Sequence, residues 1–192
     1  MPTDRRFVLI DRDGTINVER HYLSDPDQLA LIPGVGTALR RLRQAGYGIA
    51  IITNQSGIAR GYFDLERLAA IHARLAELLA AEGAGVDGIY ICPHGPDDDC
   101  ACRKPLPGMA EQAMAEHGFD PKLSTVIGDK EVDVALGKAI GAATFLVRTG
   151  HGEKYAATSA ADHVVADLAA AVDIMLGGGG ETSTKPKGQR RP

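Results

Sequence analysis

Short apolar runs alternate along the chain with longer segments whose apolar residues recur at helical spacing. The runs are typical of strands buried on both faces and lie at 7–10, 48–53, 86–91, 124–129 and 143–147, with a shorter apolar piece at 163–165. Helices are expected from Pro33 to Gly46, after Asp64, from Pro107 to Gly118, and over 131–140 and 167–176. Strands that alternate with helices predict a doubly wound α/β fold around a parallel sheet.

Polar residues follow four of these predicted strands. Asp11 and Asp13 end the first, Thr53 the second, a cysteine-containing segment the third and Asp129 the fourth. Ligands of open parallel sheets bind outside the carboxyl ends of the strands. We therefore expect these groups to meet at one edge of the sheet.

Composition and length indicate the type of hydrophobic core and the extent of the domain. The chain has 192 residues, 44% of them hydrophobic and none of them Trp, so the core is expected to be aliphatic. We expect one domain over residues 1–176. Residues 177–192, which begin with four glycines and then become basic, are expected to form a disordered tail.

The charge pattern speaks against several classes of partner. The formal net charge is −4, and the last sixteen residues carry four basic side chains against Glu181, so the body is more acidic than that value. Such a body is not typical of a nucleic-acid binder. No apolar run reaches the roughly 20 residues that cross a bilayer. We expect a cytoplasmic protein without membrane attachment, and a monomer.

The acidic residues at the strand ends suggest phosphate chemistry. Asp11, Asp13 and Asp129 offer the oxygen ligands that Mg²⁺ prefers, although an ordinary solvated strand end is the alternative for the first pair. Next to a magnesium-bound phosphate monoester, Asp11 would attack phosphorus to form an aspartyl-phosphate. Asp13 would protonate the leaving alkoxide and later activate water.

Two further residues fit the same reaction. The hydroxyl of Thr53 and the ammonium group of Lys104 would stabilise the transferring phosphoryl group, although each is also common as an ordinary surface or strand-end residue. Asp133 lies one helical turn beyond Asp129. It would either hold Lys130 or Lys104, or lie in solvent at the start of a helix.

The three cysteines of the chain lie within eleven residues, together with a histidine. Cys92, His94, Cys100 and Cys102 supply three thiolates and one imidazole, which is a complete tetrahedral Zn²⁺ shell with no open position. Such a site is structural. It would order the loop that carries Arg103 and Lys104. The histidines at 72, 117, 151 and 163 belong to no motif and are expected to be surface or core residues.

Four ordered motifs carry a resemblance to the haloacid dehalogenase (HAD) superfamily of phosphatases. They are Asp11-Arg-Asp13-Gly-Thr, Thr53-Asn54, Lys104-Pro105 and Gly128-Asp129-Lys130 with Asp133. The longer Asp-Arg-Asp-Gly-Thr-Ile-Asn-Val and Thr-Asn-Gln-Ser-Gly-Ile-Ala-Arg-Gly runs, with the cysteine motifs, resemble the heptose bisphosphate phosphatases within it. The resemblance covers about residues 7–176.

The resemblance implies a fold without a large cap domain and a mechanism for the site. It implies that Asp11 is the nucleophile, that Asp13 is the general acid/base, and that Asp11, the Asp13 carbonyl and Asp129 bind Mg²⁺. Thr53 and Lys104 would stabilise the phosphoryl group. The substrate pocket would be lined by Glu19, Arg20, His21, Tyr22, Thr53, Asn54, Gln55, Ser56, Arg103, Lys104 and Lys130.

The implied activity is removal of the 7-phosphate from D-glycero-D-manno-heptose 1,7-bisphosphate, in the synthesis of nucleotide-heptose precursors for cell-surface glycans such as lipopolysaccharide. The family is expected to carry His-Gly-Tyr or a similar run where this chain has Arg20-His21-Tyr22. Histidinol-phosphate phosphatases share much of the motif set and are the rival enzyme. A non-catalytic, zinc-stabilised binding module is the rival of another class.

Overall fold

The computed structural model describes residues 5–178. Within these residues, six parallel strands form one sheet in the order β3-β2-β1-β4-β5-β6. They are β1 (Phe7–Ile10), β2 (Gly48–Asn54), β3 (Gly88–Cys92), β4 (Thr125–Gly128), β5 (Ala143–Val147) and β6 (His163–Val165). The predicted doubly wound α/β fold is confirmed, and each strand lies within two residues of its predicted bounds.

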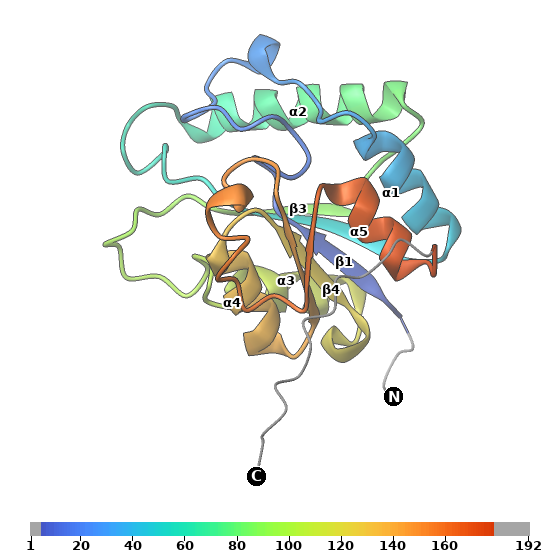
Figure 1. The fold of residues 1–192 in the computed structure, drawn as a ribbon. Coiled ribbons are helices and arrows are strands. Elements are labelled where there is room, and N and C mark those ends of the chain that lie inside the picture. Colours follow the sequence, from blue (N-terminus) through green and yellow to red (C-terminus); the bar gives the residue numbers. More distant parts are fainter. Residues whose placement is uncertain (1–4, 179–192) are drawn as a thin grey trace.

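In the described part of the chain, five α-helices cover the two faces of the sheet (Figure 1). On one face lie α1 (Val35–Gln44), α2 (Leu65–Ala81) and α5 (Leu168–Met175), and on the other lie α3 (Gly108–His117) and α4 (Glu131–Ile140). Short 3₁₀ helices occur at Pro26–Gln28, Pro121–Leu123 and Gly152–Lys154. The expected disordered tail lies almost entirely outside the described residues and stays a prediction.

The central strand shows how the aliphatic pattern builds two cores. Val8 and Ile10 point into the layer beneath α1, α2 and α5, whereas Phe7 and Leu9 point into the layer beneath α3 and α4. All four side chains are fully buried. Each such side chain contributes about 1.5–3 kcal/mol of hydrophobic stabilisation. A strand buried on both faces therefore reads as a continuous apolar run.

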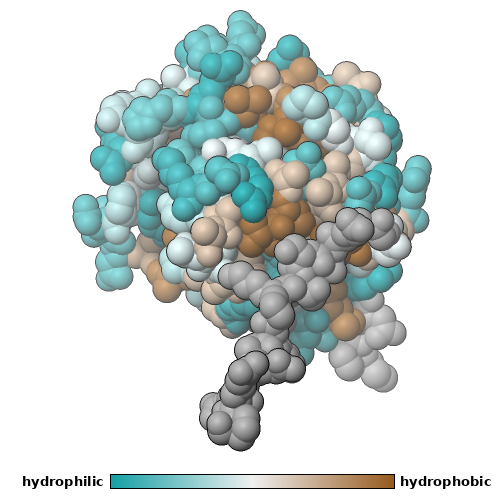
Figure 2. Space-filling model, viewed as in Figure 1, coloured by the Kyte–Doolittle hydropathy of each residue, from teal (hydrophilic) through white to brown (hydrophobic). Residues whose placement is uncertain are grey.

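The surface is mostly hydrophilic on the face shown in Figure 2, in contrast to this apolar interior. Hydrophilic residues cover most of the face in Figure 2, with hydrophobic ones gathered near its centre. Among the described residues, no helix is long and apolar enough to cross a membrane.

The strand order fixes where a site can form. The chain runs from β1 outward to β2 and β3, and then returns to β4 on the other side of β1. The carboxyl ends of β1 and β4 are thus adjacent at the point where the direction of winding changes, which is where open α/β sheets bind ligands. Residues 11–34 and 93–107 connect strands to helices at this edge, and the described residues contain no inserted cap domain.

Candidate active site

Three buried carboxylates meet at the switch point between β1 and β4. Asp11 follows β1, Asp129 follows β4, and Asp133 lies in the first turn of α4. One oxygen of each lies within 4.8 Å of the others, and their exposed fractions are 5%, 0% and 1%. The expected convergence of strand ends is present. Asp133 is therefore not a solvated first-turn acid.

Lys104 reaches this cluster from the long loop after β3. Its Nζ lies 2.8 Å from Oδ1 of Asp11 and 2.6 Å from Oδ1 of Asp133, and it also donates to the carbonyl of Ile52 at 2.8 Å. Burial lowers the pKa of Lys104, but the two carboxylates outweigh burial and raise this pKa above its usual value. Lys104 is therefore a fixed positive charge beside Asp11, and Asp133 holds it there.

The carboxylates have the properties of a site for a hard cation. Burial and the nearby Asp11 raise the pKa of Asp129 to about 8, and burial outweighs Lys104 in raising that of Asp133 to about 6. Oδ2 of Asp129 accepts a hydrogen bond from the backbone of His151 at 2.7 Å, whereas Oδ1 has no hydrogen-bond partner among the described groups. Crowded carboxylate oxygens that ionise with difficulty on their own, one of them with a free lone pair, fit Mg²⁺, whose charge would favour their ionised forms.

Two glycines let the backbone approach this cluster closely. Gly14 has φ of +82°, and a Cβ atom there would lie 2.3 Å from Oδ2 of Asp129. A Cβ at Gly150 would lie 2.2 Å from the same oxygen. Larger residues at either position would displace Asp129.

Asp13 is not part of the cluster of three carboxylates. Its oxygens accept hydrogen bonds from Arg12, from Asn17 at 3.0 Å and from Gln55 at 2.9 Å. Burial raises the pKa of Asp13, but Arg12 and the hydrogen bonds outweigh burial and lower it below its usual value. This orientation is compatible with the prediction that Asp13 offers a metal its backbone carbonyl and keeps its carboxylate for proton transfer.

The predicted substrate loop after β2 has a partly internal role. Gln55 is 5% exposed, and its Nε2 donates both to Asp13 and to Oγ1 of Thr53 at 2.8 Å. The amide of Asn54 exchanges two hydrogen bonds with the backbone of Lys104, at 3.0 and 3.2 Å. These two amides therefore fix catalytic candidates in place, in addition to lining the pocket.

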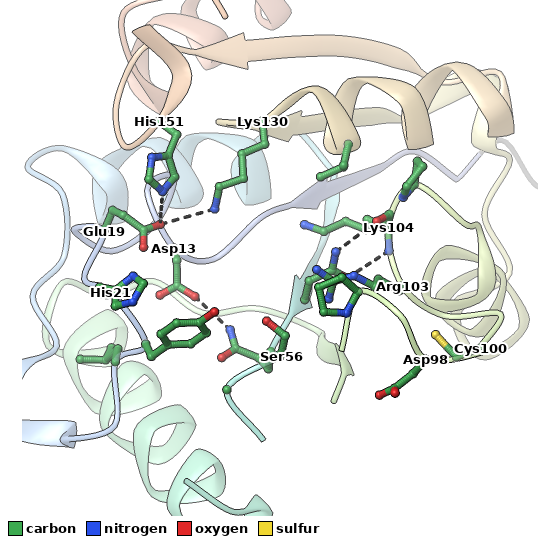
Figure 3. Close-up of a pocket in the computed structure, with 18 of the residues that line it drawn as sticks. Asp13, Glu19, His21, Ser56, Asp98, Cys100, Arg103, Lys104, Lys130 and His151 are labelled. Carbon is green, nitrogen blue, oxygen red and sulfur yellow. Dashed lines mark hydrogen bonds and ion pairs between the residues drawn. The ribbon is translucent and has the colours of Figure 1, made fainter. Parts of the chain in front are cut away.

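A cavity of about 630 Å³ opens above these groups (Figure 3). Asp13 lines it, together with ten of the eleven residues predicted to bind substrate, namely Glu19, Arg20, His21, Tyr22, Asn54, Gln55, Ser56, Arg103, Lys104 and Lys130. Thr53 lies beneath it and is 1% exposed. His151, which was expected to be a surface or core residue outside any motif, also lines this cavity.

Charged groups face one another across the cavity. Glu19 Oε2 lies 3.6 Å from Nζ of Lys130 and 3.7 Å from Nε2 of His151 on one side, and Arg103 and Lys104 lie on the other (Figure 3). Burial raises the pKa of Glu19 despite Lys130. Arg103 donates from Nη1 to the carbonyl of His94 at 3.1 Å, which ties it to the cysteine loop.

The strand-to-helix segment 18–24 forms the remaining wall. Tyr22 has φ of 52°, and its ring contacts those of His21 and Tyr62, with centroid distances of 4.4 and 4.6 Å. Arg20 donates from Nε to the carbonyl of Gln28 at 3.0 Å and is exposed.

Cys92, His94, Cys100 and Cys102 form a second cluster, beside the cavity. Zinc bonded tetrahedrally to these atom types, with Zn–S of about 2.3 Å, places two sulfurs about 3.8 Å apart and a sulfur and nitrogen about 3.6 Å apart. The Cys92–Cys100 sulfurs are 3.8 Å apart, and Nδ1 of His94 lies 3.6 Å from Cys92 and 3.3 Å from Cys102. The four ligands fit a zinc ion.

Together, the parallel sheet and the carboxylate cluster define a hydrolase of HAD type. Residues 101–171 match the model of the HAD-hydrolase-like family. A D-glycero-beta-D-manno-heptose-1,7-bisphosphate 7-phosphatase of Pseudomonas aeruginosa is 46% identical over 77% of this chain and 84% of its own. That of Bordetella bronchiseptica is 40% identical over 89% and 98% of the two chains.

Solved structures agree with the sequence matches. The D,D-heptose 1,7-bisphosphate phosphatase of B. bronchiseptica, complexed with magnesium and phosphate, aligns with a TM-score of 0.84 over 90% of this chain and 98% of its own, at 40% identity. The enzyme of Burkholderia thailandensis aligns with a TM-score of 0.70 at 33% identity, over 90% and 99% of the two chains. The chain belongs to the family of D-glycero-D-manno-heptose-1,7-bisphosphate 7-phosphatases.

Proposed function

We propose that this protein hydrolyses the 7-phosphate of D-glycero-D-manno-heptose 1,7-bisphosphate. The observation that carries the proposal is the buried contact of Lys104 with Asp11, beside Asp129 and Asp133, in a chain of this family. A binding module has no reason to bury three carboxylates and one lysine at the floor of a cavity, since burying charge is costly. This arrangement favours catalysis over the non-catalytic alternative.

The reaction follows from the placement of the side chains. A carboxylate oxygen of Asp11 attacks phosphorus, the bond from phosphorus to the sugar oxygen breaks, and Asp13 donates a proton to the departing alkoxide. Asp13 then takes a proton from water, which attacks phosphorus and releases inorganic phosphate and free Asp11. Thr53 and Lys104 stabilise the phosphoryl oxygens.

Magnesium would be held by Asp11, Asp129 and the Asp13 carbonyl. When bound, it neutralises the phosphate so that a carboxylate can approach it. Zinc would be held by the cluster of three cysteines and His94. It leaves no open position for substrate, so its role is to order the loop that ends in Arg103 and Lys104.

The cavity favours a sugar bisphosphate over histidinol phosphate. An ammonium group of the substrate would need a free carboxylate, but Glu19 already faces Lys130 and His151. Arg103, with a planar group that can bond two oxygens at once, suits a second phosphate or sugar hydroxyls. We propose that the product supplies nucleotide-heptose synthesis in the cytoplasm, because the thiolates of the zinc cluster need a reducing compartment.

A phosphate-release assay tests this function. Purified protein with Mg²⁺ is given both anomers of the heptose 1,7-bisphosphate and histidinol phosphate, with Asp11→Asn as the inactive control. We expect one of the bisphosphate anomers to have by far the highest kcat/KM. A higher value for histidinol phosphate would leave the phosphatase mechanism standing and refute the proposed substrate.

A further inference from the structure

Arg12 is a buried charge to which the reaction above assigns no role. Its side chain follows β1, between the nucleophile and Asp13, and is only 1% exposed. A buried ion pair is weak evidence for a stabilising role, because well-packed apolar residues often serve stability as well or better. The partners of Arg12 therefore decide what it does.

The guanidinium group holds both oxygens of Asp13. Nη2 donates to Oδ2 at 2.8 Å and to Oδ1 at 3.0 Å, and Nε donates to Oδ1 at 3.2 Å. Asn17 adds a bond to Oδ1 and Gln55 adds one to Oδ2. With all these donors in place, the carboxylate has one orientation.

His72 in turn holds Arg12. The remaining nitrogen, Nη1, lies 3.1 Å from Nε2 of His72, which reaches inward from α2, sixty positions further along the chain. Burial and the charge of Arg12 lower the pKa of His72 to about 4. His72 is thus neutral at pH 7, and since a guanidinium group only donates, Nε2 must accept.

We propose that Arg12, anchored by His72, is a positioning residue that fixes the Asp13 carboxylate for proton transfer to the leaving group. The inference rests on the proposed phosphatase function. Proton transfer requires heavy atoms within about 3 Å, and a misplacement of about 1 Å can cost up to about a hundredfold in rate. A guanidinium group that binds both carboxylate oxygens restricts movement of the Asp13 carboxylate better than a single point charge, such as a lysine, does.

The leaving group provides the first test. Four variants are assayed, namely Arg12→Gln, Arg12→Lys, His72→Leu and His72→Gln. Each is given two substrates: the heptose bisphosphate, whose leaving alkoxide needs a proton, and p-nitrophenyl phosphate, whose leaving phenolate needs little protonation. In single-turnover experiments, Arg12→Gln should lower the rate of Asp11 phosphorylation by the bisphosphate about 10- to 100-fold, and by the aryl ester less than about threefold, because only the first step depends on the leaving group. Arg12→Lys should recover only part of this loss.

The histidine variants separate anchoring from packing. His72→Leu, which cannot accept a hydrogen bond, should show the same selective loss at about 5- to 10-fold, whereas His72→Gln should be close to wild type because its amide oxygen can accept. Arg74→Gln is the matched control. Arg74 lies on the same helix and pairs at the surface with Glu77.

A double-mutant cycle provides the second test. If Arg12 acts through Asp13, then Arg12→Gln should change the residual bisphosphate turnover of Asp13→Asn by less than about threefold. A crystal structure of His72→Leu should show the Asp13 carboxylate displaced, and this readout needs no turnover.

Three outcomes would overturn the inference and leave Arg12 a structural residue. They are equal losses in the phosphorylation rate with both substrates, a full Arg12 effect in the Asp13→Asn background, and an unmoved Asp13. These outcomes are distinct from failure of the proposed function. In that case, wild-type protein would not release phosphate from the bisphosphate at all.

Discussion

The carboxylate cluster and the cysteine cluster each reach one cavity, through Lys104 and Cys100 respectively, but are built in opposite ways. The carboxylates come from the ends of β1 and β4 and from α4, and are brought together only by the sheet. The four thiol and imidazole ligands come from one stretch of eleven residues, 92–102. The first cluster is a product of tertiary structure and the second is a product of local sequence.

Their chemistry differs in the same way. Oxygen ligands with a free lone pair on Asp129 suit a hard ion that keeps open positions for phosphate. Sulfur and imidazole ligands in a complete set suit zinc that takes no further ligand. One cluster can act on substrate, whereas the other can act only through the residues that follow it, Arg103 and Lys104.

Removing the nucleophile should have the largest effect and should leave the fold unchanged. Asp11→Asn replaces a carboxylate by a poor nucleophile and a weaker magnesium ligand, so kcat should fall by at least about a thousandfold. Thermal unfolding followed by circular dichroism should remain within a few degrees of wild type. Near wild-type turnover by pure Asp11→Asn protein would refute the covalent mechanism.

Breaking the zinc cluster should instead lower stability and activity together. Cys102→Ser removes a thiolate next to Arg103 and Lys104, and we expect a melting temperature at least about 5 °C lower and kcat/KM about tenfold lower. Burial raises the pKa of Cys92 to about 12, so zinc must displace a proton there. Elemental analysis should find one zinc per wild-type chain, and its absence from protein made in zinc-replete cells would refute the site.

Arg103 links the two clusters, because it directly follows the zinc ligand Cys102 in the chain but lines the substrate cavity. Arg103→Ala should lower kcat/KM about tenfold for heptose 1,7-bisphosphate and much less for a small monophosphate, since it removes contacts to a second anion or to hydroxyls. Arg43→Ala is the matched control, because Arg43 is exposed, pairs with Asp87 and lies outside the cavity lining. An equal loss on both substrates would place Arg103 in the reaction itself.

The smallest expected effect is a dependence of stability on pH in metal-free protein. The folded-state pKa of Asp129, about 8, is above its ordinary value of 3.8, so the folded protein binds more protons than the unfolded chain between these values. Without Mg²⁺, stability should therefore decrease as pH rises from 5 to 8. Added Mg²⁺ should raise the melting temperature more at pH 8 than at pH 5, and the opposite order would contradict the assigned cation site.

The contrast also explains what the sequence could predict. Strands were predictable because both of their faces are buried, so each is an unbroken apolar run ending in a polar group such as Asp11 or Asp129. The zinc ligands were predictable because they are close in sequence. The cavity edge predicted from strand ends is present in the structure.

Contacts between segments far apart in the chain left no pattern in the sequence comparable to that of the strands or the zinc ligands. His151 lines the cavity because its loop packs against Gly14, more than a hundred positions earlier, and His72 reaches Arg12 from a helix whose apolar stripe does not include it. Gln55 was expected only to contact substrate, yet it also bridges Thr53 and Asp13. Such side-chain partners depend on the packed fold and not on the local pattern.

The most direct test of the account is to identify the residue that carries the phosphoryl group during turnover. Wild-type protein is mixed with heptose 1,7-bisphosphate and Mg²⁺, quenched in acid within the first turnover, digested and analysed by mass spectrometry. The account predicts a phosphoryl adduct on Asp11 that is absent from Asp11→Asn. Release of phosphate without an adduct on Asp11, or with an adduct on another residue, would contradict it.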